Sequence, residues 1–212
     1  LISEITYEEM LEMASSGAGV LMARSVEFGR RYNVPIIVKS TFKNNEGTEV
    51  KEKVMEEALV SGVTHNTKEV KFTLFEVPDQ PGIAGTVFGS LSEIGINVDM
   101  IVQNVSKDSI TDISFTAPTE QKDDVENMLK NIAAELKAKG YDIDENVARI
   151  SIIGAGMKSE SGVASKMFQI LGKNSINISM ISTSPIRVSC VIDNKDINTA
   201  LEALHKEFIE KE

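Results

Sequence analysis

The chain has 212 residues, of which 42% are hydrophobic, and this is enough for one or two small domains with buried cores. The 32 acidic residues outnumber the 22 basic ones and give a net charge of -10, which argues against nucleic acid and anionic membrane surfaces as partners. We find no apolar run long enough for a transmembrane helix, and we expect no signal peptide. Because the single cysteine, Cys190, can form no internal disulfide, we expect a cytoplasmic protein.

Residues 1–50 are predicted to form the end of a larger α/β domain and a linker. Helical patterns cover residues 6–17 and 18–33, and "VPIIVKS" (34–40) is typical of a strand. The polar segment 43–51 is interpreted as the linker. Because one strand and two helices are too few to enclose a core, we expect this part to belong to a domain whose other strands lie outside the sequence.

The rest of the sequence contains an internal duplication. Two segments match at a constant offset of 80 positions, which is the signature of a repeated structural unit. The matched pairs are Gly82 and Gly162, Phe88 and Phe168, Leu91 and Leu171, Ile96 and Ile176, and Met100 and Met180.

The first copy, residues 67–145, is predicted to have the order βαββαβ. The expected elements are a strand at 69–77, a helix at 83–94 that Gly95 ends, a hairpin of strands at 96–105 and 111–117, an amphipathic helix that Gly140 ends, and a strand at 141–144. This order is typical of a ferredoxin-like unit, in which the helices cover one face of an antiparallel sheet.

The second copy, residues 146–212, lacks the last strand of this order, so its sheet would be left with an open edge. A strand-like segment stands upstream at 58–65. We therefore predict that residues 56–66 complete the second unit and that the first unit is inserted in it. The predicted fold class is α+β, with two ferredoxin-like units preceded by the remnant of an α/β domain.

The two copies contain the motifs "VPDQPGIAGTVF", "INVDMIVQNVS", "TDISFT", "IGAGMKSESGVASKMF" and "NISMISTSPIRVSCVI". Together they resemble paired ACT domains, small modules that bind amino acids, in the regulatory region of bacterial aspartate kinases. The segments "YEEMLEMASSGAGVLMARSVE" and "YNVPIIVKSTF" are similar to the end of the kinase domain of the same family. The resemblance covers nearly the whole sequence.

The resemblance implies a regulatory function. Enzymes of this family use ATP and Mg to phosphorylate the side-chain carboxylate of aspartate, the first step towards lysine, threonine and methionine, and end products inhibit them. The family's lysine- and glycine-rich substrate segment has no match here, so we expect no catalytic residue, no cofactor and no kinase activity in these residues alone. The implied partners are the missing kinase domain and a second copy bound through the ACT domains. Some members make a short subunit that starts near the equivalent of Met55; this sequence begins earlier, so we expect a piece of a longer protein.

The polar side chains within "INVDMIVQNVS" (96–106) need partners, because polar groups beside a core are costly when unpaired. An amino acid needs an anion site and a cation site. The free N–H groups at a helix start near Gly82 can hold a carboxylate, and Asp99 can pair with an ammonium. The predicted effector-binding residues are Asp79, Gly82, Ile83, Ala84, Asn97, Asp99, Gln103, Thr111 and Ser114, and Asn104 and Ser106 are predicted to face a partner chain. Lysine is the expected effector, with threonine as the alternative.

Other interpretations stand beside this one. Asn97 and Asp99 could merely satisfy loop backbone. The second copy has Ser179 in place of Asp99, so we expect it to be mainly scaffold. The isolated His65 and His205 lack metal-ligand spacing, and "GAGMKS" lacks a complete phosphate-loop pattern. The alternative function is a free-standing ACT-type amino-acid sensor; an RNA-binding module would need exposed aromatic and basic residues.

Overall fold

The computed structural model describes residues 2–54, 59–105, 109–158 and 160–210, and the chain divides into two compact units. The central unit is Thr67–Ala148, and the outer unit joins Leu1–Asn66 with Arg149–Glu212. The described part of the chain contains no helix that is long and apolar enough to cross a membrane.

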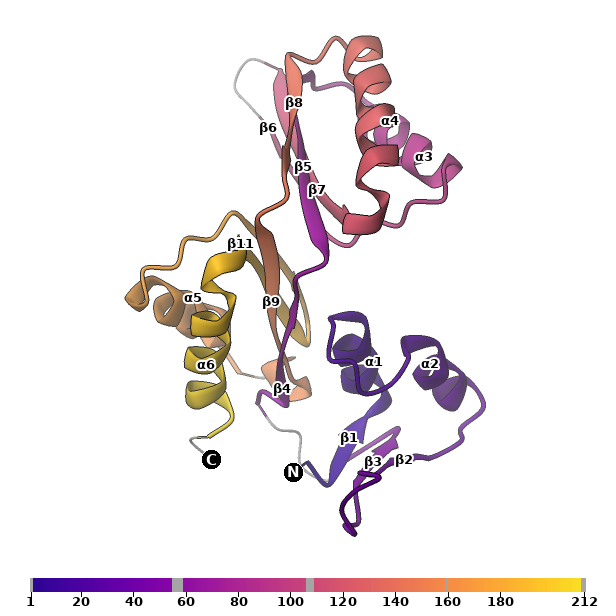
Figure 1. Ribbon diagram of the computed structural model, residues 1–212, viewed down its shortest axis with the longest axis vertical. Helices are drawn as coiled ribbons and strands as arrows, with labels where there is room; N and C mark the ends of the chain where they lie inside the picture. The colour runs from indigo at the N-terminus through magenta and orange to yellow at the C-terminus, as the bar shows by residue number, and fades with distance from the viewer. Residues whose placement is uncertain (1, 55–58, 106–108, 159, 211–212) are drawn as a thin grey trace. The chain divides into compact units, whose positions relative to one another are not determined.

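The central unit has the predicted βαββαβ order (Figure 1). Its elements are β5 (Glu69–Pro78), α3 (Ile83–Glu93), β6 (Ile101–Val105), β7 (Ile110–Pro118), a 3-10 turn at Thr119–Gln121, α4 (Lys122–Glu135) and β8 (Gly140–Asp144). The strands form an antiparallel sheet in the order β6-β7-β5-β8, and α3 and α4 cover one of its faces.

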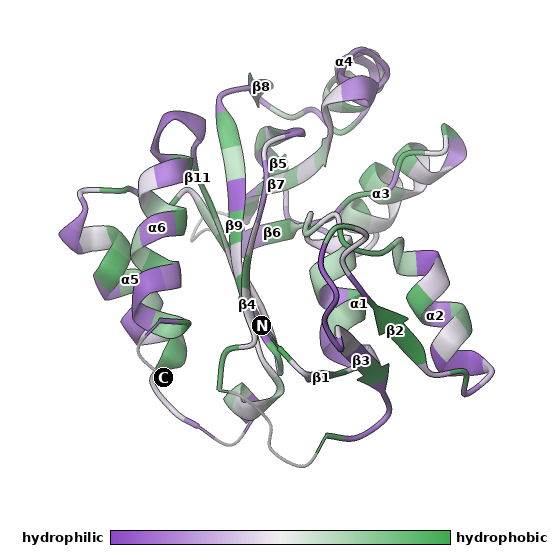
Figure 2. Ribbon diagram, turned by 60° about the horizontal axis from the view of Figure 1, so that its bottom comes forward, coloured by the Kyte–Doolittle hydropathy of each residue, from purple (hydrophilic) through white to green (hydrophobic). Residues whose placement is uncertain are grey.

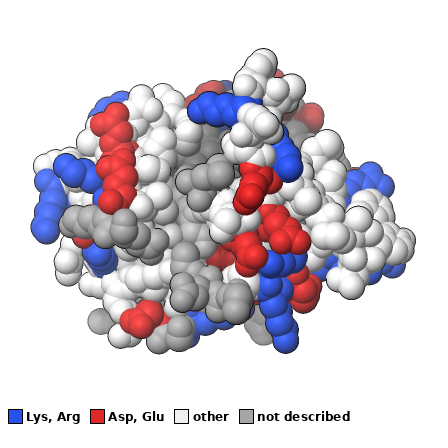
Figure 3. All heavy atoms as spheres, turned by 90° about the horizontal axis from the view of Figure 1, so that it is seen from below, with Lys and Arg blue, Asp and Glu red and all other residues white. Residues whose placement is uncertain are grey.

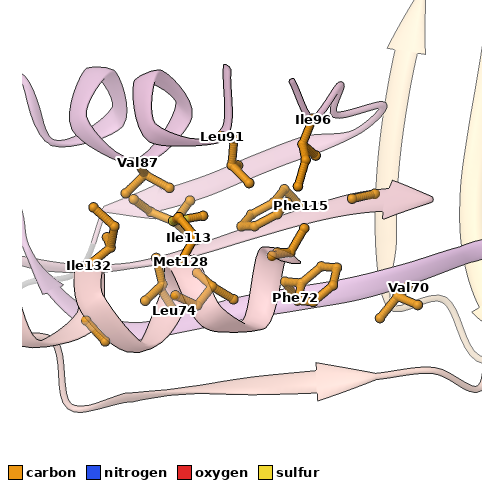
Figure 4. Packing of buried hydrophobic residues seen from close by; sticks show 14 of the residues in the cluster. Val70, Phe72, Leu74, Val87, Leu91, Ile96, Ile113, Phe115, Met128 and Ile132 are labelled. Atoms are coloured by element: carbon orange, nitrogen blue, oxygen red, sulfur yellow. The ribbon is translucent and has the colours of Figure 1, made fainter. Parts of the chain in front are cut away.

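The core of the central unit lies between this sheet and the two helices (Figure 4). Phe72 and Leu74 of β5 and Ile113 and Phe115 of β7 are fully buried at alternate positions, as the two-residue period of a strand requires. Phe72 stacks on Phe115 with ring centroids 5.3 Å apart, and Phe88 of α3 meets the same ring edge-on at 5.7 Å. This packing fixes which face of each strand is turned towards the helices.

One predicted strand of the central unit is shorter than expected. The pattern predicted a strand over 96–105, but β6 begins only at Ile101. Before that point, Asp99 donates its N–H to the carbonyl of Thr116 at 3.2 Å, and Met100 donates its N–H to the Thr116 hydroxyl at 3.2 Å. Thr116 also donates its own N–H to the carbonyl of Met100 at 3.0 Å, so Asp99 and Met100 both face Thr116 and the regular ladder starts at Ile101.

The second repeat lies in the outer unit. As predicted, its sheet includes a strand from the segment that precedes the first repeat in the sequence. Its elements are β4 (Gly62–Asn66), β9 (Val147–Ile153), a 3-10 turn at Ala155–Lys158, α5 (Val163–Lys173), β10 (Met180–Ser184), β11 (Arg187–Asp193), a 3-10 turn at Asn194–Asp196 and α6 (Ile197–Phe208). The strand order is β10-β11-β9-β4, and β4 runs antiparallel to β9 with Val63 opposite Ile152. The predicted insertion of one unit in the other is therefore confirmed.

The N-terminal segment of the outer unit contains more strands than predicted. Its elements are β1 (Glu4–Thr6), α1 (Tyr7–Ser15), α2 (Ala23–Arg31), β2 (Ile36–Val38) and β3 (Thr48–Lys51), with strand order β1-β3-β2. The interpretation of residues 43–51 as a linker was wrong for its last part, which forms β3. Only Val50 of that strand is buried, so its sequence has no apolar alternation to reveal it.

Large apolar side chains are unusually exposed in this N-terminal segment, and Figure 2 colours β2 as strongly hydrophobic. The exposed fractions are Val20 56%, Met22 73%, Tyr32 65%, Val34 54%, Ile37 59% and Phe42 97%. Such a concentration is typical of a surface that another part of a protein covers.

Gly154 provides a test of the packing beside β4. A side-chain carbon at this position would lie 2.3 Å from the carbonyl oxygen of Leu59 and 2.6 Å from Cα of Val60. We expect Gly154→Ala to lower the free energy of unfolding by about 1–3 kcal/mol, since backbone atoms would have to move. The control is Gly172→Ala in α5, where no atom lies within 4 Å and alanine should be neutral or stabilising by up to about 1 kcal/mol. Equal urea midpoints for the two variants would contradict the close approach.

Candidate effector-binding site

The N-terminus of α3 provides exposed backbone donors. Gly82 is the N-cap residue and has a φ of 97°, a conformation that glycine adopts without strain. Its carbonyl accepts the N–H of Thr86 at 2.9 Å, which is the first bond of the helix. The N–H of Ile83 donates to the carbonyl of Gln80 at 3.3 Å, whereas the exposed amides of Gly82 and Ala84 have no backbone acceptor among the described residues. Two of the three predicted amides can therefore receive a carboxylate.

The end of β5 lies beside this helix start. Asp79, which is half-buried, donates its N–H to the carbonyl of Ser109 at 2.8 Å and so ties the loop to the start of β7. The hairpin turn between β6 and β7 is at the same end of the sheet. Ser106, which was predicted to face a partner chain, lies outside the described residues.

The register of β6 and β7 separates the polar residues of the predicted site between the two faces of the sheet. Gln103 is opposite Ile113, whose side chain is in the core, so Gln103 is on the helix-covered face together with Thr111. Asn104 and Ser114 are on the other face. Gln103 and Asn104 are exposed at the edge of the sheet.

The two predicted hydroxyls have partners within the sheet. Thr111 is buried, and its hydroxyl donates to the carbonyl of Asn104. The hydroxyl oxygen of Ser114 lies 3.0 Å from that of Thr73 on the neighbouring strand. Both groups therefore stabilise strand pairing in the described structure, and a ligand would have to compete with these bonds.

Asp99 and Asn97 lie at the opposite end of the central unit from the α3 amides. Asp99 bonds to Thr116, which is paired with Lys71 near the start of β5, whereas α3 follows the end of β5 at Pro78. Seven residues of strand correspond to about 20 Å. Figure 4 shows the same separation, with Val87 towards one end and Ile96 beyond the other end of α3. One chain therefore does not bring the predicted anion site and the predicted cation site together.

Comparisons with known proteins assign the repeats to a family. Residues 72–137 match a family model described as ACT domain, and residues 150–208 match a second ACT domain model. The chain is 48% identical to an aspartate kinase of Pseudomonas fluorescens over 210 residues, which is 98% of this chain and 51% of that protein. The regulatory subunit of aspartate kinase from Thermus thermophilus is 36% identical with a TM-score of 0.67, covering 71% of this chain and 99% of that one. The chain belongs to the aspartate kinase family.

Within that family, the chain corresponds to the regulatory part. It spans about half the length of the curated relatives it matches. Aspartokinase III of E. coli in complex with lysine and aspartate is 24% identical with a TM-score of 0.74, covering 98% of this chain and 46% of that one, and this likeness shows the fold alone. The expected family and fold class are thus confirmed.

The second repeat of this aspartate kinase region has the same glycine N-cap at its first helix, but it lacks the equivalent of Asp99. Gly162 caps α5 with a φ of 93°, and its carbonyl accepts the N–H of Lys166 at 2.9 Å, as in the first repeat. Ser179 replaces Asp99, and both its N–H and its hydroxyl donate to the carbonyl of Val191, at 2.8 and 3.1 Å. The position that has a carboxylate in the first repeat is a sheet contact in the second.

The other side chains of this regulatory region that could carry chemistry are the single cysteine and the acidic groups. Burial raises the pKa of Cys190 to about 12, so its thiol stays protonated. No group of three or more His, Cys, Asp or Glu side chains within the described residues is placed to hold a metal ion. Acidic and basic side chains lie next to one another on the face shown in Figure 3, without the broad basic field of a nucleic-acid surface.

The Thr73–Ser114 contact gives a test of whether Ser114 serves the sheet or a ligand. We expect Ser114→Ala to lower the free energy of unfolding by about 1 kcal/mol, because it leaves the buried Thr73 hydroxyl without this partner. The double variant with Thr73→Val should recover part of this loss in urea unfolding. If Ser114→Ala instead keeps its stability but loses affinity for amino acids, the hydroxyl belongs to the binding site.

Proposed function

We propose that the chain is the regulatory region of an enzyme that uses ATP and Mg to phosphorylate the side-chain carboxylate of aspartate, and that it binds an end-product amino acid for feedback inhibition. Lysine is the first candidate and threonine the second. The observation that carries the proposal is the pair of exposed amides on the glycine-capped start of α3, together with the exposed Asp99 that precedes the edge strand β6. The family relationship and the lysine complex of the E. coli relative support it.

We further propose that the effector site is built from two chains. β6 is an edge strand of its sheet, and the exposed Ile101 on it is 48% accessible. Because β6 ends at the same end of the sheet where α3 begins, antiparallel pairing of two β6 strands about a two-fold axis would bring the start of one strand beside the helix start of the other. Asp99 and Asn97 of one chain would then approach Gly82 and Ala84 of its partner.

This arrangement matches the chemistry of a free amino acid. The α-carboxylate would accept hydrogen bonds from the Gly82 and Ala84 amides, where the helix dipole favours negative charge. Asp99 would pair with an ammonium group, either the α-ammonium or the side-chain ammonium of lysine. Gln103, which is exposed on the helix-covered face, would be placed between the two charged ends.

The exposed apolar residues between Val20 and Phe42 fit a further part of this proposal. In a complete aspartate kinase, the rest of the kinase domain would cover them and would supply the catalytic residues and the nucleotide site. A free-standing amino-acid sensor, the alternative function, has no comparable use for such a surface. Amino-acid inhibition of aspartyl phosphate formation by the complete protein would support the kinase proposal; a complete protein without this activity would favour the sensor.

Asp99→Ala tests the cation site. Because truncating one partner of a partly desolvated charge pair costs about 2–5 kcal/mol, the dissociation constant should rise by roughly thirty-fold or more at about 1.4 kcal/mol per decade. The matched control is Ser179→Ala at the equivalent position of the second repeat, which should bind almost as wild type does. Calorimetric titration of lysine and threonine into both variants checks this. If Asp99→Ala binds lysine and threonine as tightly as wild type, Asp99 is not part of the effector site and its role is structural.

Mixing two variants tests whether the site spans two chains. Ala84→Asp would repel the effector's carboxylate and is compatible with the first turn of a helix, while Asp99→Ala would remove the cation site. Each variant alone should lose binding. After unfolding and refolding together, about a quarter of the wild-type number of sites should return, because half of the dimers are mixed and each holds one intact site. Sedimentation provides the control that dimers form; dimers without any recovered binding would place the site within one chain.

A further inference from the structure

A buried carboxylate joins the N-terminal segment to the second repeat within the outer unit. Glu9 of α1 is only 2% exposed. Its Oε2 accepts the N–H of Thr6 at 3.2 Å and the hydroxyl of Thr6 at 2.7 Å, which is part of a capping box. Its Oε1 accepts the hydroxyl of Ser61 at 2.5 Å and the N–H of Ala155 at 2.9 Å. One oxygen therefore bonds to the start of its own helix, and the other bonds to the second repeat.

The hydrogen bonds keep Glu9 ionised. Burial raises the pKa of the carboxyl group, but the hydrogen bonds from Ser61, Ala155 and Thr6 outweigh this effect and leave the pKa below the ordinary value of glutamate. An ionised acceptor makes stronger hydrogen bonds than a neutral one.

The two donors on Oε1 flank the two strands that connect the outer unit with the central unit. Ser61 immediately precedes β4, and Ala155 follows β9 after one residue. β4 and β9 pair along their whole overlap, from Gly62 opposite Ile153 to Asn66 opposite Arg149. At its other end, this two-stranded ribbon continues through residues 67–68 into β5 and through residues 145–146 into β8. Glu9 thus binds the ribbon at the end remote from the central unit.

Two further carboxylates of α1 strengthen the same link. Glu12 pairs with Arg187 of β11 at 2.8 Å, and both side chains are largely buried, with exposed fractions of 25% and 18%. Glu8 pairs with Lys158 at 3.0 Å in a more exposed position. Met13 packs in the same cluster as Ile153, the last residue of β9. Three carboxylates of α1 and Met13 therefore contact the second repeat, two of the carboxylates near the end of the ribbon.

We propose that Glu9 is the positioning residue through which effector binding at the central unit reaches the N-terminal segment and the kinase domain that it would join. The inference rests on the proposed regulatory function. The β4–β9 ribbon transmits any displacement of the central unit along its two strands, and both strands end at donors to the same oxygen of Glu9. Withdrawing a hydrogen-bond donor from a buried carboxylate costs free energy. A displacement of the ribbon would therefore displace α1 with it, because this keeps the hydrogen bonds of Glu9 intact.

The test uses the complete enzyme that contains this chain. Glu9→Gln replaces one carboxylate oxygen by an NH2 group, which cannot accept hydrogen bonds, so one of the two pairs of donors loses its acceptor. Ser61→Ala removes a single donor from Oε1 and is the variant of choice if Glu9→Gln does not fold. The control is Glu126→Gln on α4, whose carboxylate forms a surface pair with Lys130. Calorimetry measures amino-acid affinity, and aspartyl phosphate formation measures the uninhibited rate and the concentration for half inhibition.

We expect Glu9→Gln to bind lysine or threonine within about two-fold of wild type and to keep its uninhibited rate, while half inhibition requires at least ten times more effector. Ser61→Ala should shift in the same direction by about three-fold or more, and Glu126→Gln should not shift. If Glu9→Gln and Ser61→Ala are both half inhibited at the same effector concentration as wild type, this inference is overturned and the proposed function is not. A wild-type enzyme that binds none of the common amino acids would overturn the proposed function and this inference with it.

Discussion

The pairing of β4 with β9 is the interaction on which the architecture of this chain depends. It completes the sheet of the second repeat with β4, a strand that precedes the first repeat in the sequence. The chain therefore enters the central unit from β4 and leaves it through β9, and these two strands are antiparallel neighbours. Without β4, the fully buried β9 would become an edge strand with exposed backbone groups.

The two repeats share one fold but differ in their polar side chains. Both keep a glycine N-cap in the left-handed region, at Gly82 and Gly162, so the backbone of the helix start is conserved between them. They differ where the chain returns to the sheet: Asp99 is exposed in the first repeat, whereas the Ser179 hydroxyl is bonded to Val191 in the second. A charged, exposed side chain in the first repeat thus corresponds to a neutral hydroxyl that bonds to the sheet in the second. The second repeat instead uses its loop after β9 to hold α1.

Most of the fold could be predicted because the repeat and its hydrophobic periods are local in sequence. The elements of both ferredoxin-like units, and the completion of the second by residues 56–66, were predicted from apolar spacing and from the need to avoid an open edge. β3 escaped prediction because only Val50 of that strand faces a core. The start of β6 was misplaced because Asp99 and Met100 both bond to Thr116, and this irregular pairing leaves no period in the sequence.

The candidate site was predictable in its chemistry but not in its assembly. Residue types identified exposed amides near Gly82 and a carboxylate at Asp99, yet strand direction places them at opposite ends of one central unit. Sequence reasoning also missed Glu9, although the T-x-x-E spacing of Thr6 and Glu9 is a recognisable capping box. Its second oxygen bonds to residues 52 and 146 positions away, and only the fold brings these together.

The ionisation of Glu9 has a consequence for how the link responds to pH. Because its pKa is lowered in the folded chain, its hydrogen bonds contribute stability that is fully present above the ordinary pKa of glutamate and is lost only as the pH falls through the lower, folded value. At neutral pH the contact between α1 and the β4–β9 ribbon is therefore independent of small pH changes. Under the proposed function, the binding of an effector, rather than protonation of Glu9, would therefore be the event that changes the position of α1.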